Sequence, residues 1–401
     1  MKILMLTPYL PYPPASGGQI RTLNLLKYLS KTNDITLVAL YKNDKEKKYS
    51  THLKSFCKKV YVCKRPEKPW QIGTILKSIF SALPFLVVRN YSYEAQDVVT
   101  KLLKEEEFDV IHAETFYIMP HIPLTTIPVL LVEQTIEFKV YQHYVSSLPY
   151  LLRWVLTLDI IKLKFWEIYY WKKAQIVATV SASDKSIIQE CVPDNETFVI
   201  PNGAGDEMFL QKIPKKDITK PTLLFVGNFS WLQNTEAAMY LIEKVFPKLN
   251  KALPHIKLII AGQNVKSKLN FRHTENIEVI DIAPDDHETI KDLYHDATIF
   301  VAPIFGPGGT RLKILAAMAS GLPIVTTKTG VEGLEITENE DILVANSPAE
   351  FVKKIQMLLE DEDRFMRMQK TSFAVVKEKY SWNAIAKKLE MVYKNSMHKT
   401  V

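Results

Sequence analysis

The sequence of 401 residues contains few cysteines and no long apolar run. Its three cysteines, Cys57, Cys63 and Cys191, are odd in number and lack the spacing of a metal site. A disulfide scaffold is therefore unfavourable, and we expect a cytoplasmic protein. No stretch approaches the roughly 20 uninterrupted apolar residues of a membrane-spanning helix. The apolar start reaches a proline at Pro8, too early for a signal peptide, so we expect a first buried strand there.

Several catalytic patterns are also missing from the sequence. We find no zinc-ligand cluster, nucleophile elbow or Walker-type loop. The first half lacks the G-x-G-x-x-G fingerprint, which argues against an oxidoreductase. The triplet Asp361-Glu362-Asp363 fits an Asp-x-Asp metal pattern, but it lies between two amphipathic helical patterns, and we interpret it as a solvated helix cap. We therefore expect no metal ion and no cofactor.

The composition is that of a globular protein with a modest basic excess. Hydrophobic residues make up 47% and charged residues 24%, which excludes wholesale disorder. The net charge of +7 is concentrated in 42–68, where ten basic residues face three acidic ones. Such a segment suits an anionic membrane or substrate. A solvated lysine-rich face explains it equally well. Nothing indicates nucleic-acid binding.

Strand-length apolar runs alternate with helical patterns along the whole chain. Many of the runs are continuous, as parallel strands covered on both faces require. The helical pattern 19–30 places Ile20, Leu23, Leu26 and Leu29 on one face. The alternation predicts an α/β fold of two doubly wound, Rossmann-like domains. The expected strands are 2–7, 35–41, 60–63, 109–113, 129–132, 176–180 and 198–200 in the first half, and 223–226, 257–261, 277–280, 299–302, 324–327 and 342–344 in the second.

These patterns also predict the domain boundaries. Residues 1–204 form the first domain, 205–220 a linker with Pro214 and four lysines, and 221–380 the second domain. Open α/β sheets bind ligands at the carboxyl ends of their strands. Two such domains facing a cleft would therefore present the residues that follow each strand.

The segment 148–173 interrupts the alternation because it is long, apolar and rich in aromatic residues. It contains three tryptophans among scattered lysines. Tryptophan and tyrosine next to basic residues are typical of a membrane interface. A long helix packed against the first domain is an equally good interpretation.

Two glycine-containing segments follow expected strands and precede helices. Gly17-Gly18 precedes the first helix, although a glycine pair is also an ordinary turn. The segment 302–313 is more informative, because three glycines and Thr310 lead into a helix that carries Arg311 and Lys313 at its start. Basic residues oppose the helix dipole there unless an anion is bound. This pattern predicts a diphosphate site, where fixed positive charge stabilises a leaving group.

The motifs resemble those of the retaining GT-B glycosyltransferases of glycosyltransferase family 4 over nearly the whole chain. The resemblance includes residues 11–18, 201–203 and 225–228, and is most specific in 306–323 and 330–334. It implies a GT-B architecture in which the second domain binds a nucleoside-diphosphate sugar and the first binds an acceptor. It also implies that a C-terminal helix within 381–401 packs back on the first domain.

The sequence departs from the family pattern at four positions. Gly308 and Ala316 stand where two glutamates are usual, the second of which binds the ribose hydroxyls. Gln134 stands where histidine is typical, and it cannot carry a proton in the same way. A basic pair usual after the first strand of the donor domain is replaced by residues 228–231. Arg311 and Lys313 are expected to take over its role toward phosphate.

The expected function is transfer of a hexose from a nucleoside-diphosphate sugar to a glycan or lipid-linked acceptor with retention, in the assembly of cell-surface polysaccharide or glycoconjugate. The protein would be cytoplasmic, at the inner face of the membrane if it has peripheral contact with anionic lipid. A scaffold or partner subunit without catalysis, and an epimerase or phosphorylase with the same fold, are the alternatives. The expected catalytic residues are Gln134, Glu137, Arg311 and Lys313; the donor-binding residues are Gly17, Gly18, Gly227, Asn228, Ile282, Gly308, Gly309, Thr310, Arg311, Lys313 and Glu332; the acceptor-side residues are His112, Glu114 and Glu133.

Overall fold

A computed structural model describes residues 1–401 except 69, 147, 271–273, 285, 307–311 and 398–401. The chain divides into two compact units, Met1–Pro201 with Ile385–Val401, and Asn202–Ala384. Residues 205–220, expected to be a linker, belong to the second unit. Met208 is buried there, and the backbone N–H of Leu210 donates to the carbonyl oxygen of Ala319.

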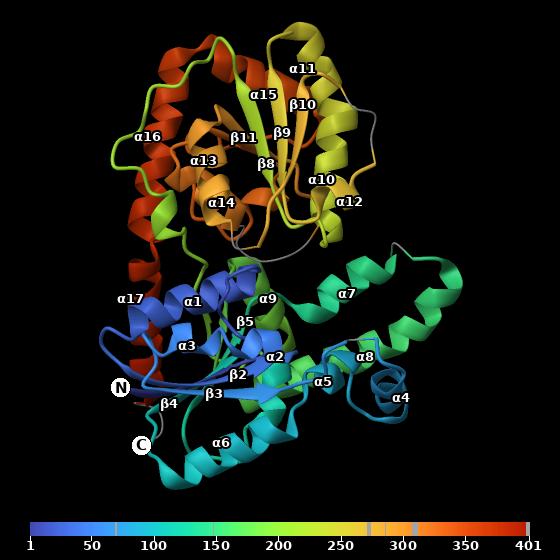
Figure 1. The fold of residues 1–401 in the computed structure, drawn as a ribbon, viewed down its shortest axis with the longest axis vertical. Helices are drawn as coiled ribbons and strands as arrows, with labels where there is room; N and C mark the ends of the chain where they lie inside the picture. Colours follow the sequence, from blue (N-terminus) through green and yellow to red (C-terminus); the bar gives the residue numbers. More distant parts are fainter. Residues whose placement is uncertain (69, 147, 271–273, 285, 307–311, 398–401) are drawn as a thin grey trace. The chain divides into compact units, whose positions relative to one another are not determined.

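The first unit is built on a parallel sheet, with helices on both of its faces (Figure 1). Its described strands follow the order β3-β2-β1-β4-β5-β6-β7, and Met5 of β1 pairs with His112 of β4. The order reverses between β1 and β4, which is the switch point where doubly wound sheets bind ligands. The strands are β1 (Lys2–Thr7), β2 (Asp34–Tyr41), β3 (Lys59–Lys64), β4 (Val110–Glu114), β5 (Val129–Glu133), β6 (Ile176–Thr179) and β7 (Thr197–Val199).

The helices of the first unit include one long rod, α8. The C-terminal helix α17 begins at Trp382, and from Ile385 onward it belongs to this unit. The helical elements are α1 (Gly17–Leu29), α2 (Asp44–Lys47), α3 (Ser50–Leu53), α4 (Ile72–Phe80), α5 (Phe85–Asn90), α6 (Tyr93–Glu105), η1 (Phe116–His121), α7 (Glu137–Ser146), α8 (Tyr150–Lys173), α9 (Ala182–Cys191) and α17 (Trp382–Met397).

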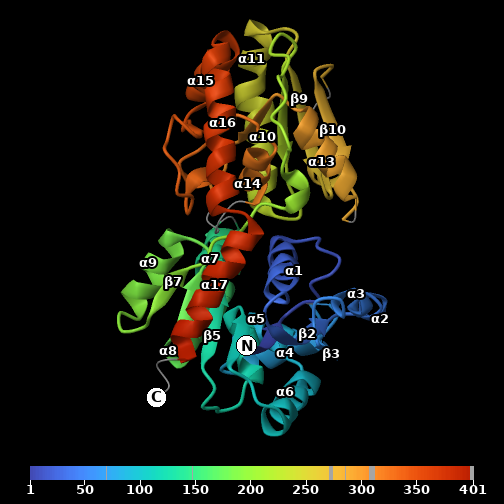
Figure 2. The same ribbon diagram turned by 90° about the vertical axis from the view of Figure 1, so that its left-hand side faces the viewer.

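The second unit repeats this plan with the order β10-β9-β8-β11-β12-β13. Leu223 of β8 pairs with Ile299 of β11 across its switch point. Helices α15 and α16 lie side by side on this unit (Figure 2). Its strands are β8 (Thr222–Val226), β9 (Lys257–Gly262), β10 (Ile277–Asp281), β11 (Ile299–Ala302), β12 (Ile324–Thr326) and β13 (Leu343–Val344). Its helical elements are η2 (Asp206–Met208), α10 (Leu232–Tyr240), η3 (Leu241–Val245), α11 (Phe246–Ala252), α12 (Val265–Lys268), α13 (His287–Asp296), α14 (Leu312–Ala319), η4 (Thr329–Val331), α15 (Pro348–Glu360) and α16 (Glu362–Lys379).

The sheets are covered because their strands are apolar on both faces. All residues of β4, β5, β6 and β11 are buried, including their few polar side chains. Continuous apolar runs therefore identified parallel strands correctly, and the prediction of two Rossmann-like domains is confirmed.

Three local expectations differ from the structure. The sequence pattern in 236–250 predicts a helix, whereas the structure passes from α10 through a π-helical turn, η3, into α11, which carries Pro247 in its first turn. Proline lacks the N–H that a continuous helix needs. The expected strand 198–200 begins and ends one residue earlier, at Thr197–Val199. In α1 the buried side chains include Arg21 and Thr22, whereas Ile20 and Leu23 are half-buried.

The solvated cap expected at residues 361–363 is confirmed. The Asp361 side chain accepts a hydrogen bond of 2.9 Å from the backbone N–H of Arg364 and thereby begins α16. Among the described residues, no group of three or more His, Cys, Asp or Glu side chains is arranged to hold a metal ion. No helix within the described parts of the chain is long and apolar enough to cross a membrane.

Candidate functional site

The loops after β8 and β9 meet at the carboxyl edge of the second sheet. Gly262 ends β9 with φ of 140°, a conformation that favours glycine. A Cβ atom at Gly262 would lie 1.8 Å from the carbonyl oxygen of Gly227. Only a residue without a side chain allows this approach, so Gly262 brings the two loops together.

Amide side chains connect these loops. The Asn228 Nδ2 donates to Oε1 of Gln263 at 2.8 Å, and the Asn234 Nδ2 donates to the carbonyl oxygen of Asn228 at 2.7 Å. A Cβ at Gly227 would lie 2.9 Å from Cγ of Asn234, so this glycine also permits close packing. All three amide side chains are half-buried. They form a neutral polar edge beside the switch point of the second sheet.

Lys313 brings a positive charge to this edge from the first turn of α14. Its Nζ donates to Oδ1 of Asn234 at 2.6 Å and lies 4.6 Å from the centre of the Phe225 ring. The Tyr294 hydroxyl donates to the Lys313 carbonyl oxygen at 3.2 Å, which fixes the start of α14. The cation is therefore held at the end of β8, partly shielded from solvent and close to the amide groups.

The other donor-binding predictions have different outcomes. Gly308, Gly309, Thr310 and Arg311 lie outside the described residues. The Ile282 side chain is buried in the core. Its backbone N–H donates to the carbonyl oxygen of Gly262, so Ile282 supports the loop that follows β9. Glu332 follows η4 and is exposed.

Asn234 and Gln263 were not among the predicted site residues. Gln263 immediately follows β9, so inspection of every strand end could have found it. Asn234 lies in the first turn of α10, and its partners Asn228 and Lys313 are distant in sequence. No spacing signal identifies such a residue.

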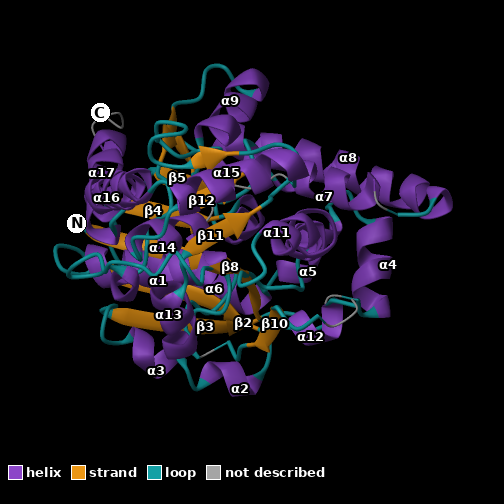
Figure 3. Cartoon of the chain, turned by 90° about the horizontal axis from the view of Figure 1, so that it is seen from above, coloured by secondary structure: helices purple, strands orange, loops and turns teal. Residues whose placement is uncertain are grey.

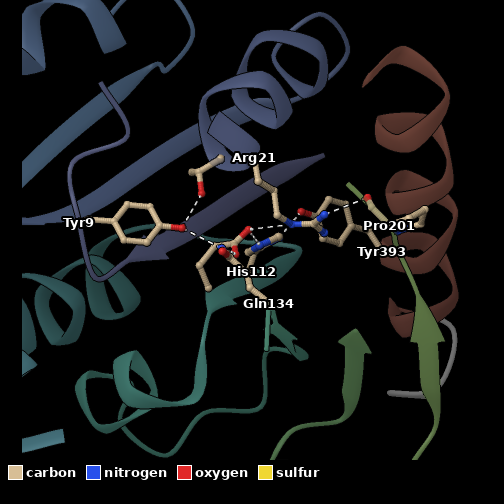
Figure 4. Close-up of polar contacts among 8 residues, drawn as sticks. Tyr9, Arg21, His112, Gln134, Pro201 and Tyr393 are labelled. Carbon is tan, nitrogen blue, oxygen red and sulfur yellow. Dashed lines mark hydrogen bonds and ion pairs between the residues drawn. The ribbon is translucent and has the colours of Figure 1, made fainter. Parts of the chain in front are cut away.

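In the first unit, a largely buried polar network joins the ends of β1, β4 and β5 (Figure 4). The Gln134 Nε2 donates to the Tyr9 hydroxyl at 2.8 Å and to Oε2 of Glu114 at 2.6 Å. The Tyr9 hydroxyl also bonds to the Thr22 hydroxyl of α1 at 3.1 Å. Gln134 therefore connects Tyr9 with Glu114 within the network.

The same network reaches the C-terminal helix α17 through His112. The His112 Nε2 donates to Oε1 of Glu114 at 3.0 Å, and its Nδ1 bonds to the Tyr393 hydroxyl (Figure 4). Arg21 places Nε 4.0 Å from the same carboxylate oxygen and donates from Nη1 to the carbonyl oxygen of Pro201 at 2.9 Å. His112 and Glu114 are fully buried, so these predicted acceptor-side residues are structural partners within this unit.

The pKa shifts follow from this burial. Burial alone would raise the pKa of Glu114, but hydrogen bonding from His112 and the charge of Arg21 outweigh it and hold that pKa below its ordinary value. Burial lowers the pKa of Arg21, against the attraction of Glu114. Burial and the nearby Glu114 charge raise the pKa of Tyr9 well above its ordinary value. The network thus holds a buried carboxylate and guanidinium as an ion pair.

Gly18 fits the start of α1 against this network. Ser16 caps the helix by accepting from the Gln19 backbone N–H. A Cβ at Gly18 would lie 2.6 Å from the Tyr9 hydroxyl oxygen and 2.7 Å from Oε1 of Gln134. Gly17 is the first residue of α1 and is exposed. A residue other than glycine at position 18 would displace Tyr9 or Gln134.

Glu133 and Glu137 occupy a different environment from Gln134. The Glu133 Oε1 accepts from the Trp171 indole N–H at 2.8 Å inside the core, and the backbone N–H of Glu137 donates to Glu167 at 2.8 Å. Glu133 is the last residue of β5 and points to Trp171, whereas Gln134 follows the strand and points to Tyr9 and Glu114. Burial raises the pKa of Glu133 and Glu167 well above their ordinary values, and that of Glu137 to about 7. The expectation that Glu133 is an acceptor-side group therefore needs correction, because its carboxylate is buried.

Comparison with known proteins agrees with this architecture. Residues 220–361 match the family model described as Glycosyl transferases group 1. An uncharacterised 44.6 kDa protein in the cps region of Klebsiella pneumoniae is 24% identical and covers 94% of this chain and 96% of its own. Sucrose-phosphate synthase from Thermosynechococcus elongatus superposes with a TM-score of 0.72 at 15% identity over the full length of both chains. Anabaena HepE, solved in complex with UDP, gives 0.65 at 14% identity over 98% of this chain and 100% of its own.

The fold is therefore GT-B. The matched domain includes β8 to β13 and the edge where Asn228, Asn234 and Lys313 lie. Fold and domain match together support a GT-B glycosyltransferase.

Proposed function

We propose that the protein transfers a sugar from a nucleoside-diphosphate sugar to a glycan or lipid-linked acceptor. The observation that carries this proposal is the lysine at the start of α14, which is held beside three amide groups at the carboxyl edge of the second sheet. Positive charge at a helix start opposes the helix dipole, and a bound anion at this end of the helix offsets that repulsion. The diphosphate of a donor is such an anion.

Two relatives support the donor and the pathway. Anabaena HepE is described in complex with UDP-glucose at a TM-score of 0.64 and 15% identity. The Klebsiella pneumoniae relative is named for the cps region. We infer that the present chain likewise uses a nucleotide sugar and acts in the assembly of cell-surface polysaccharide or glycoconjugate.

In the proposed reaction, the acceptor hydroxyl oxygen forms a bond to the anomeric carbon while the bond from that carbon to the diphosphate breaks. Lys313, together with Arg311 and the backbone of Gly309 and Thr310, stabilises the negative charge that develops on the diphosphate. The hydroxyl proton passes to a donor phosphate oxygen, because Gln134 cannot accept a proton. Fixed cations take the place of a metal ion in this scheme, and the anomeric configuration is retained.

The remaining predicted residues have narrower proposed roles. Gly227 and Asn228 line the donor edge next to Lys313. Gln134 and Gly18 form the acceptor side of the first unit, with His112 and Glu114 as positioning residues behind them. The roles expected for Glu137, Glu332 and Gly17 stay predictions.

A second function, a scaffold subunit without catalysis, is favoured by two positions. The Gln134 amide donates both to Tyr9 and to Glu114, so it is committed to the network. Ala316 is a half-buried residue of α14 that packs on the core of the second unit and has no group to bind a ribose.

Product analysis distinguishes the two functions. The full-length protein is incubated with a mixture of nucleotide sugars and candidate acceptors, and the products are followed over time by mass spectrometry and NMR. Transfer of one sugar with retained configuration supports the proposal, and an inverted product would overturn the retaining mechanism. If no nucleotide sugar is transferred, hydrolysed or bound, the result supports the scaffold function instead.

A further inference from the structure

Helix α8 exposes a stripe of large apolar side chains. Trp154, Leu158, Ile161 and Phe165 are 60–66% exposed. Their spacings of four, three and four residues place them on one face of the helix. The opposite face contains the buried Leu163 and packs into the first unit. The stripe is therefore a continuous apolar face without a partner among the described residues of this unit.

Helix α4 adds a second exposed apolar face. Ile72 is 77% exposed and Phe80 is 85% exposed, and Leu76 and Ile79 between them are also exposed. The residues that α4 buries are the small Thr74 and Ser78. A helix normally turns its apolar side to the core, so this helix is oriented opposite to the usual arrangement.

Hydrogen bonds join the two helices. The Lys162 Nζ of α8 donates to the carbonyl oxygens of Ser78 at 3.0 Å and Ser81 at 2.8 Å, at the end of α4. The Trp166 indole N–H donates to the carbonyl oxygen of Ala82 at 2.8 Å. Figures 1 and 3 both place α4 next to α8. We call the exposed apolar faces of these two helices the α4–α8 surface.

The charges on these helices are sorted by sign. The two acidic residues of α8 point inward: Asp159 accepts from the backbone N–H of Phe85 at 2.9 Å, and Glu167 is fully buried. Helix α4 has no acidic residue, and its Lys77 is exposed. Lys164 and Lys172 of α8 are also exposed. The described solvent-facing side chains of both helices are thus apolar, polar or basic.

We propose that the α4–α8 surface binds the interface of an anionic lipid bilayer. Aromatic and aliphatic side chains enter the boundary between headgroups and acyl chains, while lysines beside them reach the anionic headgroups. The helices lie along the membrane, since neither spans it. A protein partner with a matching acidic rim, or a second copy of this chain, is the competing occupant. A second copy brings its own lysines, and like charges would oppose that contact.

The basic segment 42–68 does not belong to this surface. Lys58, Lys59 and Lys64 each lie 2.8–3.8 Å from a carboxylate of the same unit, and all three side chains remain solvated. The charge of these three lysines is therefore partly compensated within the molecule. The proposed membrane contact is placed on α4 and α8.

Vesicle co-sedimentation of the full-length protein tests this proposal without requiring enzymatic activity. We expect binding to phosphatidylcholine vesicles that contain phosphatidylglycerol and release as salt rises, because exposed charge is screened. Ile161→Asp and Phe80→Asp are each expected to weaken binding at least about tenfold, through lost apolar burial and added negative charge. Leu124→Asp, at a position that is 90% exposed outside the surface, is the matched control and should bind as the natural protein does.

Circular dichroism of each variant verifies that it folds. Equal sedimentation with and without phosphatidylglycerol, or an equal loss in Leu124→Asp and Ile161→Asp, would overturn the proposal. So would a dimer in lipid-free solution that the same two substitutions dissociate, because the occupant would then be a second copy. Since sedimentation needs neither donor nor acceptor, an inactive protein that still binds vesicles would affect only the proposed function.

Discussion

The carboxyl edges of the two sheets have similar topology but carry different groups of polar side chains. At the first edge, Arg21, His112 and Glu114 are fully buried and bond to one another. At the second edge, the half-buried Lys313 donates to the half-buried Asn234 among amide side chains. The first edge holds a buried ion pair, whereas the described part of the second edge places a lysine beside neutral amide side chains. This difference agrees with the proposal that the second edge binds the donor diphosphate, while the network at the first edge holds the elements of its unit in place.

Burial explains why the first edge must be compensated. Removing one partner of a buried ion pair leaves the other charge unpaired, and this lowers the stability of the fold by more than the intact pair adds to it. Each member of the network therefore depends on the others. The network also holds α17 by the Tyr393 hydroxyl and residue Pro201 by the Arg21 guanidinium. The polar residues here therefore fix the positions of β1, β4 and the C-terminal helix.

The largest expected effect is a loss of stability when the network at the first edge is broken. Glu114→Ala leaves the Arg21 charge buried without its carboxylate and should lower the free energy of unfolding by about 3–5 kcal/mol. Urea unfolding measures this loss. Glu190→Ala, at an exposed position on α9, is the matched control and should change stability by less than about 0.5 kcal/mol. A similar small loss in both variants would show that the network is not a compensated ion pair.

A smaller effect is expected on donor affinity at the second edge. Ala316→Glu adds a carboxylate to α14. At this position the glycosyltransferase family that the chain resembles usually has a glutamate that binds the ribose hydroxyls. A charge-assisted hydrogen bond should tighten nucleotide-sugar binding by about 1.5–3 kcal/mol, or roughly ten- to a hundredfold. Calorimetric titration measures it, with Ala316→Gln as the neutral counterpart, which should gain less. If a folded Ala316→Glu variant gains no affinity over the natural protein, the donor orientation is wrong.

The smallest effect concerns pH and the carboxylates behind the first edge. Burial raises the pKa of Glu137 to about 7 from the model-compound value of 4.5. The folded protein then holds a proton more tightly than the unfolded chain, so the contribution to stability is present below pH 4.5 and is lost as pH rises to 7. Glu137→Gln should therefore be more stable than the natural protein at pH 8, by about 1 kcal/mol given its partial exposure.

Thermal unfolding at pH 5 and pH 8 tests this difference, with Glu190→Gln as the exposed control. The advantage of Glu137→Gln over the natural protein should grow between the two values. An advantage that is the same at both pH values, or one that the control shares, would mean that Glu137 titrates as an ordinary carboxylate.

The fold was predictable from local patterns, whereas the network was not. The expected strand 35–41 corresponds to β2 at Asp34–Tyr41 because parallel strands are continuously apolar. Arg21 interrupts the apolar pattern of α1, yet it is buried because Glu114 lies 4.0 Å away. Sequence separation conceals such a partner. Only a tertiary structure brings the two residues together.

The donor edge shows the same limit. Helix electrostatics pointed to Lys313 from the sequence alone, and the structure places it beside Asn234. Asn234 gave no signal, because an amide in the first turn of a helix is ordinary, whereas Gln263 could be found only by inspecting every strand end. Glu133 was expected on the acceptor side, but its carboxylate lies in the core against the Trp171 indole.

The most direct measurement is the binding of nucleoside diphosphates to the full-length protein by calorimetry, with uridine, guanosine and adenosine diphosphates as probes. The account predicts that at least one binds, and that Lys313→Ala and Arg311→Ala each weaken its binding by about 1.5–3 kcal/mol. Lys251→Ala, at an exposed position on α11, should leave the affinity unchanged. Unchanged affinity in both Lys313→Ala and Arg311→Ala would contradict the placement of the diphosphate at the second edge.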